Sequence, residues 1–266
     1  MRGLSETTRT TKPKALYFLL FLLLMTVWFP SARAANVLIQ PSTQDTSIWE
    51  NLVPPPDLGS DPDMDVGRLD PNFYAYPVHR ALVAFDLSSI PLGSTINSAN
   101  LSLFRYGYLG NPVGRTHWAY RITQSWTENG ATWIDRDGGS WVTPGGDYTT
   151  AGGASSPLTA LTISWNVTDI VKAWIENGED NYGFLIKDGD ETTLGNWTWL
   201  YCTRENIINE SRPMLEIDYT PPLSIPVGGT ILGPDYLLVL LGFLAPWIMV
   251  VAASAAVVVK KRRARR

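Results

Sequence analysis

The 266-residue sequence is poor in the residues from which most catalytic and metal centres are built. It contains one cysteine, Cys202, and two histidines, His79 and His117. A single cysteine excludes an internal disulfide and a zinc site made of several thiolates. Two histidines are too few for most histidine-based hydrolytic or metal sites. These scarcities disfavour the commonest enzyme classes, and both histidines are expected to be ordinary surface or packed residues.

Charged residues are also scarce, at 17% of the chain, whereas hydrophobic residues make up 45% and aromatic residues 11%. A chain this rich in bulky apolar side chains can bury a core, so disorder is excluded for most of its length. One domain of fewer than about 200 residues, with additional segments, is the organisation that the length favours.

The few charges are unevenly distributed. Of the 21 lysines and arginines, five precede Ala35 and six lie in the last seven residues, 260–266. Of the 25 acidic residues, only Glu6 precedes Ala35. Residues 35–259 therefore carry ten basic and 24 acidic groups, a net charge of −14. The middle of the chain is acidic, and both ends are basic.

The N-terminal end has the pattern of a secretory signal. Basic residues are followed by an apolar run, 15–29, and then by the small-residue pattern Ala32-Arg33-Ala34. This order is typical of signal peptides, so we predict that residues 1–34 are removed by cleavage before Ala35. An uncleaved anchor is the alternative, although the run is short for the roughly 20 residues that a membrane span needs.

The C-terminal end has the pattern of a membrane anchor. Residues 236–259 contain no charge, and a helix of this length can cross a hydrocarbon core about 30 Å thick. Residues 221–235, rich in proline and glycine, are predicted to form a stalk. The basic tail, 260–266, is expected in the cytoplasm, which leaves residues 35–220 outside the cell. This placement fits a topogenic signal, so we expect a single-pass cell-membrane protein with no nucleic-acid partner.

Residues 35–220 alternate apolar and polar side chains in short runs bounded by proline, glycine, asparagine and aspartate, which is typical of a β-sandwich or barrel. Strands are predicted over residues 37–40, 80–85, 99–106, 117–123, 161–167, 182–187, 197–202 and 214–219. One short helix is predicted to begin with Thr168 as its cap and to end at Gly178, over an end or edge of the sandwich. Residues 51–65 and 135–157 are predicted to be long loops outside the core.

Several motifs in this segment follow the order of a known family. They are Gln44-Asp45-Thr46-Ser47-Ile48, Val66-Gly67, the run 80–91, Ser125-Trp126-Thr127-Glu128, the run 165–171, Asn181-Tyr182-Gly183, Arg204-Glu205 and Arg212-Pro213-Met214-Leu215. Together they resemble a DNRLRE domain, a family that partly coincides with carbohydrate-binding module family 96. The resemblance covers residues 35–220, with Thr203 standing where a serine commonly precedes Arg-Glu. It implies an all-β, jelly-roll β-sandwich on a secreted or surface protein, and the stalk, span and tail resemble those of archaeal surface proteins.

Three classes of function remain open. The first is a membrane-anchored, extracellular, non-catalytic module that binds a glycan of the cell envelope or its surroundings. The second is a structural or adhesive protein of the cell envelope that binds protein or matrix. The third is a hydrolase with two facing carboxylates, for which Glu128 is the most suggestive candidate. Because Glu128 lies in a family motif, a hydrogen-bonding role that fixes a loop is the favoured interpretation.

Aromatic side chains are the strongest binding signal, because they pack on the apolar faces of sugar rings. The tryptophans of family motifs, Trp126, Trp133, Trp165 and Trp174, are expected to pack in the core. In the run 197–202, period-two alternation places Trp197, Trp199 and Tyr201 on one face, which we expect to point inward. Aromatic residues near the long loops are the predicted glycan-binding residues: Trp49, Tyr74, Tyr76, Trp118 and Trp141. The net charge of −14 favours a neutral glycan or contacts bridged by a cation.

Acidic and polar motifs suggest further sites. Asp61, Asp63 and Asp65 alternate as the carboxylates of calcium loops do, but Val66 and Asn72 exclude an EF-hand. A structural calcium shared with another segment and a solvated acidic loop both remain open, and no other cofactor is predicted. Arg204, Glu205 and Arg212 are expected to form a structural ion-pair cluster. Four sequons predict glycosylation, at Asn100, Asn166, Asn196 and Asn209.

Overall fold

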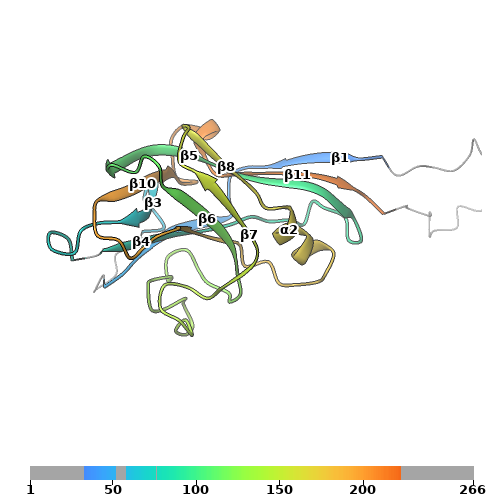
Figure 1. The fold of residues 1–266 in the computed structure, drawn as a ribbon. Coiled ribbons are helices and arrows are strands. Elements are labelled where there is room, and N and C mark those ends of the chain that lie inside the picture. Colours follow the sequence, from blue (N-terminus) through green and yellow to red (C-terminus); the bar gives the residue numbers. More distant parts are fainter. Residues whose placement is uncertain (1–32, 52–57, 76, 223–266) are drawn as a thin grey trace, which may run out of the picture. The chain divides into compact units, whose positions relative to one another are not determined.

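The structure is a computed structural model that describes residues 33–51, 58–75 and 77–222 (Figure 1). Nearly all of the predicted signal peptide and stalk, and all of the predicted transmembrane helix and basic tail, lie outside these residues. In the part of the chain that is described, no helix is both long and apolar enough to cross a membrane.

The described residues form a β-rich, sandwich-like fold with one short α-helix (Figure 1). The strands are β1 (Ala35–Ile39), β2 (Gln44–Trp49), β3 (Asp63–Arg68), β4 (Val78–Ala84), β5 (Thr95–Gly110), β6 (Thr116–Ile122), β7 (Tyr148–Pro157), β8 (Thr162–Asn166), β9 (Phe184–Asp188), β10 (Trp197–Cys202) and β11 (Met214–Thr220). The helices are α2 (Thr168–Ile175) and the 3₁₀-helix η1 (Asn209–Ser211).

The sheet is antiparallel and curls upon itself, in the order β1-β11-β5-β10-β3-β4-β9-β6-β7, with β2 on β4 and β8 on β5. The long strand β5 joins the two layers. In its first half Leu101 faces both Leu215 of β11 and Trp165 of β8, and in its second half Tyr108 faces Trp199 of β10. Because β5 contributes to both layers, the sheet can wrap around one core.

The main core lies inside this wrapped sheet. Its largest fully buried side chains include Trp165, Tyr201 and Phe184, and α2 adds Ile170, Val171 and Trp174. The prediction that the aromatic face of β10 points inward is confirmed for Trp199, 3% exposed, and Tyr201, 0% exposed. Burial of such aromatic and branched side chains is the main stabilising contribution to a sandwich of this size.

A second, smaller core lies under the segment that joins β6 to β7. It contains Ile48, Leu82 and Leu185 from the sheet, covered by Trp126 and Trp141 from the connecting segment. The indole Nε1 of Trp126 donates to the Tyr182 carbonyl at 2.8 Å, and that of Trp141 donates to the Thr132 carbonyl at 2.9 Å. The prediction that residues 135–157 lie outside the core is therefore wrong at Trp141, whose ring is buried and whose indole N–H group is satisfied. The prediction that Trp126 packs in a core is confirmed.

The elements differ from the predicted ones at particular places. Each predicted strand overlaps an observed one, but β2, β3 and β7 are additional. β7 lies inside the predicted loop 135–157, and β3 begins in the predicted loop 51–65 and extends past it. The helix begins at Thr168, so Thr168 is not its cap; the capping residue is Val167, which makes no side-chain cap hydrogen bond. The Thr168 hydroxyl is used elsewhere, since it accepts from the Ala99 N–H at 2.9 Å.

Both ends of the described chain leave the sheet at the same end. Ala35 of β1 pairs with Tyr219 of β11, and Thr220 pairs with Thr95 at the start of β5. The other end of β5, Gly110, pairs with Trp197 of β10. The loops near Gly110 and Trp197 therefore lie at the end remote from the chain ends.

Candidate functional site

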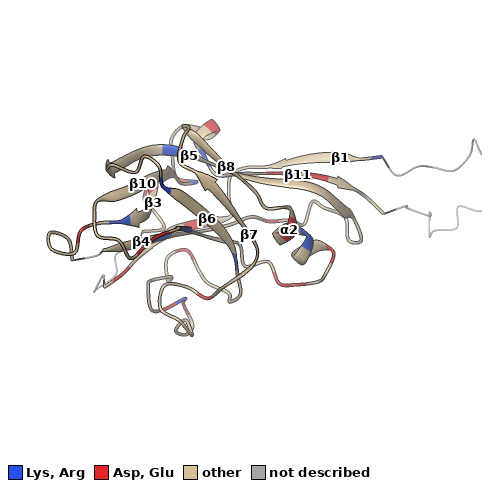
Figure 2. Ribbon diagram, in the orientation of Figure 1, with Lys and Arg blue, Asp and Glu red and all other residues tan. Residues whose placement is uncertain are grey.

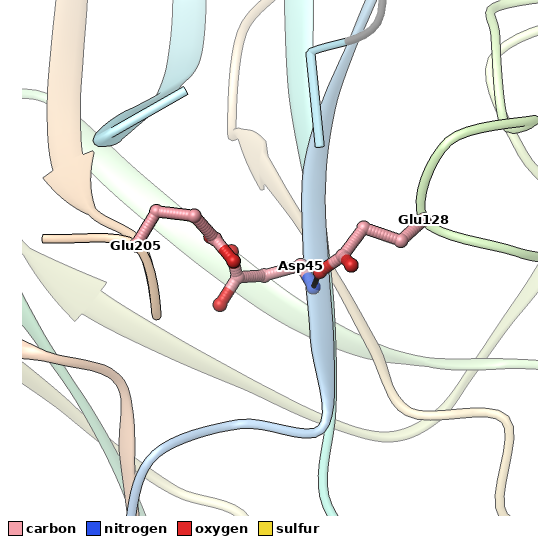
Figure 3. A group of neighbouring side chains, drawn as sticks. All are labelled: Asp45, Glu128 and Glu205. Atoms are coloured by element: carbon pink, nitrogen blue, oxygen red, sulfur yellow. Dashed lines mark hydrogen bonds between the residues drawn. The ribbon is translucent and has the colours of Figure 1, made fainter. Parts of the chain in front are cut away.

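Three carboxylates from distant parts of the chain converge beside β2 (Figure 3). Asp45 belongs to β2, Glu128 to the segment after β6, and Glu205 to the turn after β10. One oxygen of each lies within 4.8 Å of the others. Figure 3 shows the side chains of Glu128 and Glu205 reaching Asp45 from opposite sides. We call these three residues the acidic cluster.

Arg204 supplies a cation to the acidic cluster. Its Nη2 lies 2.8 Å from Glu128 Oε2, its Nε lies 2.8 Å from Glu205 Oε1, and its backbone N–H donates to Asp45 Oδ2 at 3.1 Å. Glu128 also accepts from the backbone N–H of Asp45 at 2.9 Å. The predicted loop-fixing role of Glu128 is confirmed, as is the pairing of Arg204 with Glu205. Arg212 stands apart and donates to the Asn206 carbonyl instead.

Burial dominates the electrostatics of the acidic cluster. Asp45 has no exposed surface, and burial raises its pKa to about 7 even though the Ser42 hydroxyl donates to it. Burial also raises the pKa of Glu205, against the influence of Arg204. Three clustered carboxylates need a compensating cation or a proton. Because the Arg204 guanidinium already pairs with Glu128 and Glu205, the acidic cluster links three segments of the chain and is not arranged as a pair of free catalytic carboxylates.

The three aspartates predicted to bind calcium lie on or just before β3. Asp65 is buried, and burial, with Asp63 nearby, raises its pKa to about 7; its Oδ2 lies 3.5 Å from His79 Nδ1. Asp63 is half-buried and Asp61 is exposed. Among the described residues these three do not form a group whose ligand atoms lie within 4.8 Å of one another. Their calcium role stays a prediction, which the effect of a chelator on the melting temperature would test.

An aromatic ladder crosses the sheet from β6 to β7. Trp118 stacks on Tyr120 with ring centroids 5.6 Å apart, and Tyr120 stacks on Tyr148 with centroids 5.0 Å apart. Trp118 and Tyr120 are two residues apart in β6, so they share one face of the sheet. We call Trp118, Tyr120 and Tyr148 the aromatic ladder. The sequence predicted a role for Trp118 but missed its two partners, although the Trp-Ala-Tyr alternation was a usable signal.

Arg80 extends the ladder. Its guanidinium carbon lies 5.9 Å from the ring centroid of Tyr148 and 4.8 Å from that of Trp133. The same group forms a two-pronged ion pair with Glu191, at 2.9 and 2.8 Å, and Lys187 Nζ lies 2.9 Å from Glu191 as well. Acidic and basic residues are interspersed along the sheet and loops (Figure 2). The cations beside the ladder are therefore already paired.

The aromatic residues predicted to bind a glycan occupy different environments. Trp118 is a rung of the ladder; Tyr74 is 44% exposed; and Trp49 is half-buried and stacks on His79 with centroids 4.6 Å apart. Trp141 is only 4% exposed, so its ring packs in the second core and offers little surface to a ligand. Tyr76 lies outside the described residues. Within the described part of the chain, no ring contact joins any two of the other four, and their binding roles stay predictions.

The two histidines and the sequons have defined places. His79 and His117 are packed, at 2% and 1% exposed, as expected. Asn100 of β5 faces Asn166 of β8 across the sheet. Asn196 and Asn209 are exposed, although the Asn196 Oδ1 accepts from the Asp70 N–H at 2.7 Å. Glycosylation at the four asparagines stays a prediction.

Comparison with known proteins adds one finding. Residues 59–219 match the model of carbohydrate-binding module family 96, and this match covers more than half of the chain. It includes β3 to β11, and with them the aromatic ladder, Glu128 and Arg204, but not Asp45. No curated protein matches the sequence. Modules of this class bind carbohydrate and are not themselves catalytic.

Proposed function

The chain belongs to carbohydrate-binding module family 96, and on that premise we propose that it is a non-catalytic module that holds a glycan outside the cell while tethered to the membrane. The family match carries this proposal. The acidic cluster supports its non-catalytic part, because Arg204 already binds the three carboxylates that come together. The tether rests on the sequence pattern of residues 236–266, and the extracellular location on that pattern together with residues 1–34.

The finer fold assignment is part of the proposal. Jelly rolls are sandwiches of two antiparallel layers, and the curled antiparallel sheet of this protein, whose long strand β5 belongs to both layers, supports that assignment. We therefore assign residues 35–220 to a jelly-roll sandwich.

The positions of the chain ends support display of the module at a surface. Residues 35 and 220 leave the sheet at one end, and the loops near Gly110 and Trp197 lie at its other end.

Charge favours a neutral glycan. The segment 35–259 carries −14, and long-range repulsion slows the approach of polyanions. Local cations do not reverse this field, since Arg80, Arg115 and Arg204 are each paired with a carboxylate of the protein.

Affinity electrophoresis or retention on immobilised polysaccharides would test the proposal. The full-length protein should be purified in a detergent without a sugar headgroup, because a glycosidic detergent would compete. We expect retention on a neutral polysaccharide that changes little between low and high salt. Retention on no glycan would contradict the proposal, and retention only on a uronate polymer, lost as salt rises, would contradict its neutral-ligand part.

The adhesive alternative has one observation in its favour. Exposed apolar side chains gather on the loops near Asn196, which accepts from the N–H groups of Asp70 and Asn111. Phe73, Val113 and Leu194 there are 80%, 81% and 59% exposed. If adhesion is the function, replacing Phe73 and Leu194 by serine should abolish attachment to envelope protein. If glycan binding is the function, the same replacements should leave retention on glycan unchanged.

A further inference from the structure

A pocket lies between the turn 142–147, the two residues that follow β6 (Thr123 and Gln124) and the start of β7. Its volume is about 510 Å³, and it is open to solvent. Pockets of roughly 300 to 1,000 Å³ are the usual size for small organic ligands. Tyr148, the last rung of the aromatic ladder, lines this pocket and gives it an aromatic surface.

The turn that forms the rim of the pocket is fixed by its own sequence, Pro144-Gly145-Gly146-Asp147. Both oxygens of Asp147 accept backbone N–H groups, from Val142 and from Thr143, each at 2.8 Å. Gly145 donates to the Trp133 carbonyl at 2.6 Å, and its own carbonyl accepts from Arg80 at 2.7 Å. The rim is therefore held before any ligand arrives, which lowers the entropic cost of binding.

Glycine is required at this turn. Gly145 has a φ of +93°, and a Cβ there would lie 2.6 Å from Arg80 Nη1 and 2.8 Å from Trp133 Cζ2. Gly145 therefore packs closely against Arg80 and Trp133, directly beside Gly146 and Asp147, which line the pocket. The positive φ explains the glycine without any functional argument, but the fixed position of the rim is what a binding site needs.

Four polar side chains line the pocket and have unused hydrogen-bonding capacity. Within the described part of the chain, these four side chains make no hydrogen bond to another protein group; they belong to Thr123, Gln124, Thr143 and Thr150. Hydroxyl and amide groups can each donate and accept, as sugar hydroxyls can. One aromatic wall with several such groups around it matches the two-sided chemistry of a sugar ring, which has apolar C–H faces and a polar rim.

The charge of the pocket selects against acidic sugars. No lysine or arginine lines it, and Asp147 is the one ionisable carboxylate among its lining residues. The nearby cation Arg80 is bound to Glu191 and to the Gly145 carbonyl. In this pocket a uronate carboxylate would be desolvated without a cation to pair with and would lie near Asp147, whereas a neutral sugar carries no charge to be desolvated.

We propose that this pocket, walled by Tyr148, is the glycan-binding site of the module and that it takes a short segment of a neutral oligosaccharide. This assignment rests on the proposed carbohydrate-binding function and locates it. None of the aromatic residues singled out from the sequence lines the pocket; in the segment 135–157 the sequence pointed to Trp141 and not to Tyr148.

Isothermal titration of the full-length protein, in the non-glycosidic detergent, with the neutral oligosaccharide that the retention assay identifies would test the site. Gln124→Ala and Thr150→Val each remove one hydrogen-bonding group, and we expect each to weaken binding about 2- to 10-fold. Tyr148→Ala removes the aromatic wall and should weaken binding at least about tenfold. Thr162→Val, on the exposed side of β8, should change the dissociation constant less than about twofold.

The outcomes separate the site from the function. If Trp118→Ala abolishes binding while Gln124→Ala and Thr150→Val bind like the wild type, the pocket is overturned and the glycan-binding function stands. If the wild type binds no glycan at all, both fall. If the pocket variants lose affinity for a uronate polymer instead, the neutral ligand class is wrong. If Tyr148→Ala lowers the melting temperature markedly, the affinities of Gln124→Ala and Thr150→Val decide the test, because Gln124 is only half-buried and Thr150 is exposed.

Discussion

Replacing Arg204 by methionine should destabilise the ectodomain far more than the loss of an ordinary surface arginine. Arg204 contacts Glu128 and Glu205, each at 2.8 Å, and donates to the Thr43 carbonyl at 2.9 Å. Removing one partner of a fully buried ion pair costs about 3–5 kcal/mol, and an exposed pair contributes about 0.2–1 kcal/mol. The Arg204 side chain is 35% exposed and that of Glu128 is 14% exposed, so solvent screening places the expected loss in between, at about 2–3 kcal/mol.

Arg121→Met is the matched control, because Arg121 pairs with a single carboxylate, Glu179, which is 52% exposed. For a domain of this size, 1 kcal/mol corresponds to roughly 2–4 °C, so Arg204→Met should lower the melting temperature by about 4–12 °C at pH 7.5 and Arg121→Met by much less. Circular dichroism melts of residues 35–222 would measure both. The deficit of Arg204→Met should shrink near pH 5, where Asp45, with its raised pKa of about 7, is protonated. Equal melting temperatures for the two variants, with no dependence on pH, would refute this account of the acidic cluster.

Three further predictions follow from the same structure. The pKa values of Asp45 and Asp65 are raised to about 7, so the folded protein retains protons that the unfolded chain releases above about pH 4. The free energy of unfolding, measured in urea, should therefore fall between about pH 4 and pH 7, by up to about 4 kcal/mol per group. Asp45→Asn should reduce this dependence of stability on pH. Stability that rises over this range would contradict the prediction. Gly145→Ala should lower the free energy of unfolding by about 1–3 kcal/mol more than Gly138→Ala, since both glycines have positive φ but only Gly145 is crowded. Equal losses of stability in chemical denaturation would show that the turn can rearrange to accommodate the added Cβ. Residues 35–222, expressed without the flanking segments, should unfold cooperatively because they lie within one compact unit, and a molten product would count against this boundary.

The strands that the sequence predicts are those whose buried face is apolar. β11 alternates as expected, with Leu215 and Ile217 fully buried, and β10 buries the aromatic side chains of Trp199 and Tyr201. β2 was missed because three of its buried residues are polar: Asp45, Thr46 and Ser47 are at most 3% exposed. β7 was missed because its central residues are small, Ala151-Gly152-Gly153-Ala154, and give no hydrophobic period. A pattern of hydrophobicity cannot mark a strand whose burial is compensated by hydrogen bonds or whose side chains are nearly absent.

The site could be predicted only where its residues are near one another in sequence. The Trp-Ala-Tyr alternation of β6 is local, but the stacking of Tyr120 on Tyr148 depends on the pairing of β6 with β7. In the acidic cluster, Glu128 lies 83 residues and Arg204 lies 159 residues from Asp45 in the sequence. The order of the motifs indicated that all three segments belong to one domain, but it could not show that Arg204 binds the carboxylates. Trp141 shows the opposite error, since a tryptophan in a glycine-rich segment resembles an exposed ligand contact until the segment is found to cover a core.

Charge is the feature for which the structure changes the argument most. The sequence shows ten basic groups scattered among 24 acidic ones in residues 35–259, and scattered cations could still be free to meet an acidic sugar. In the structure, five of the ten pair with carboxylates of the protein: Arg80, Arg115, Arg121, Lys187 and Arg204. A ligand carboxylate would have to displace the protein's own carboxylate from its cation and leave it unpaired. When the ion pair is buried, the free energy lost in this way exceeds the free energy gained from the new contact. A neutral ligand avoids that exchange, and the salt dependence of binding therefore measures how much of the recognition is ionic.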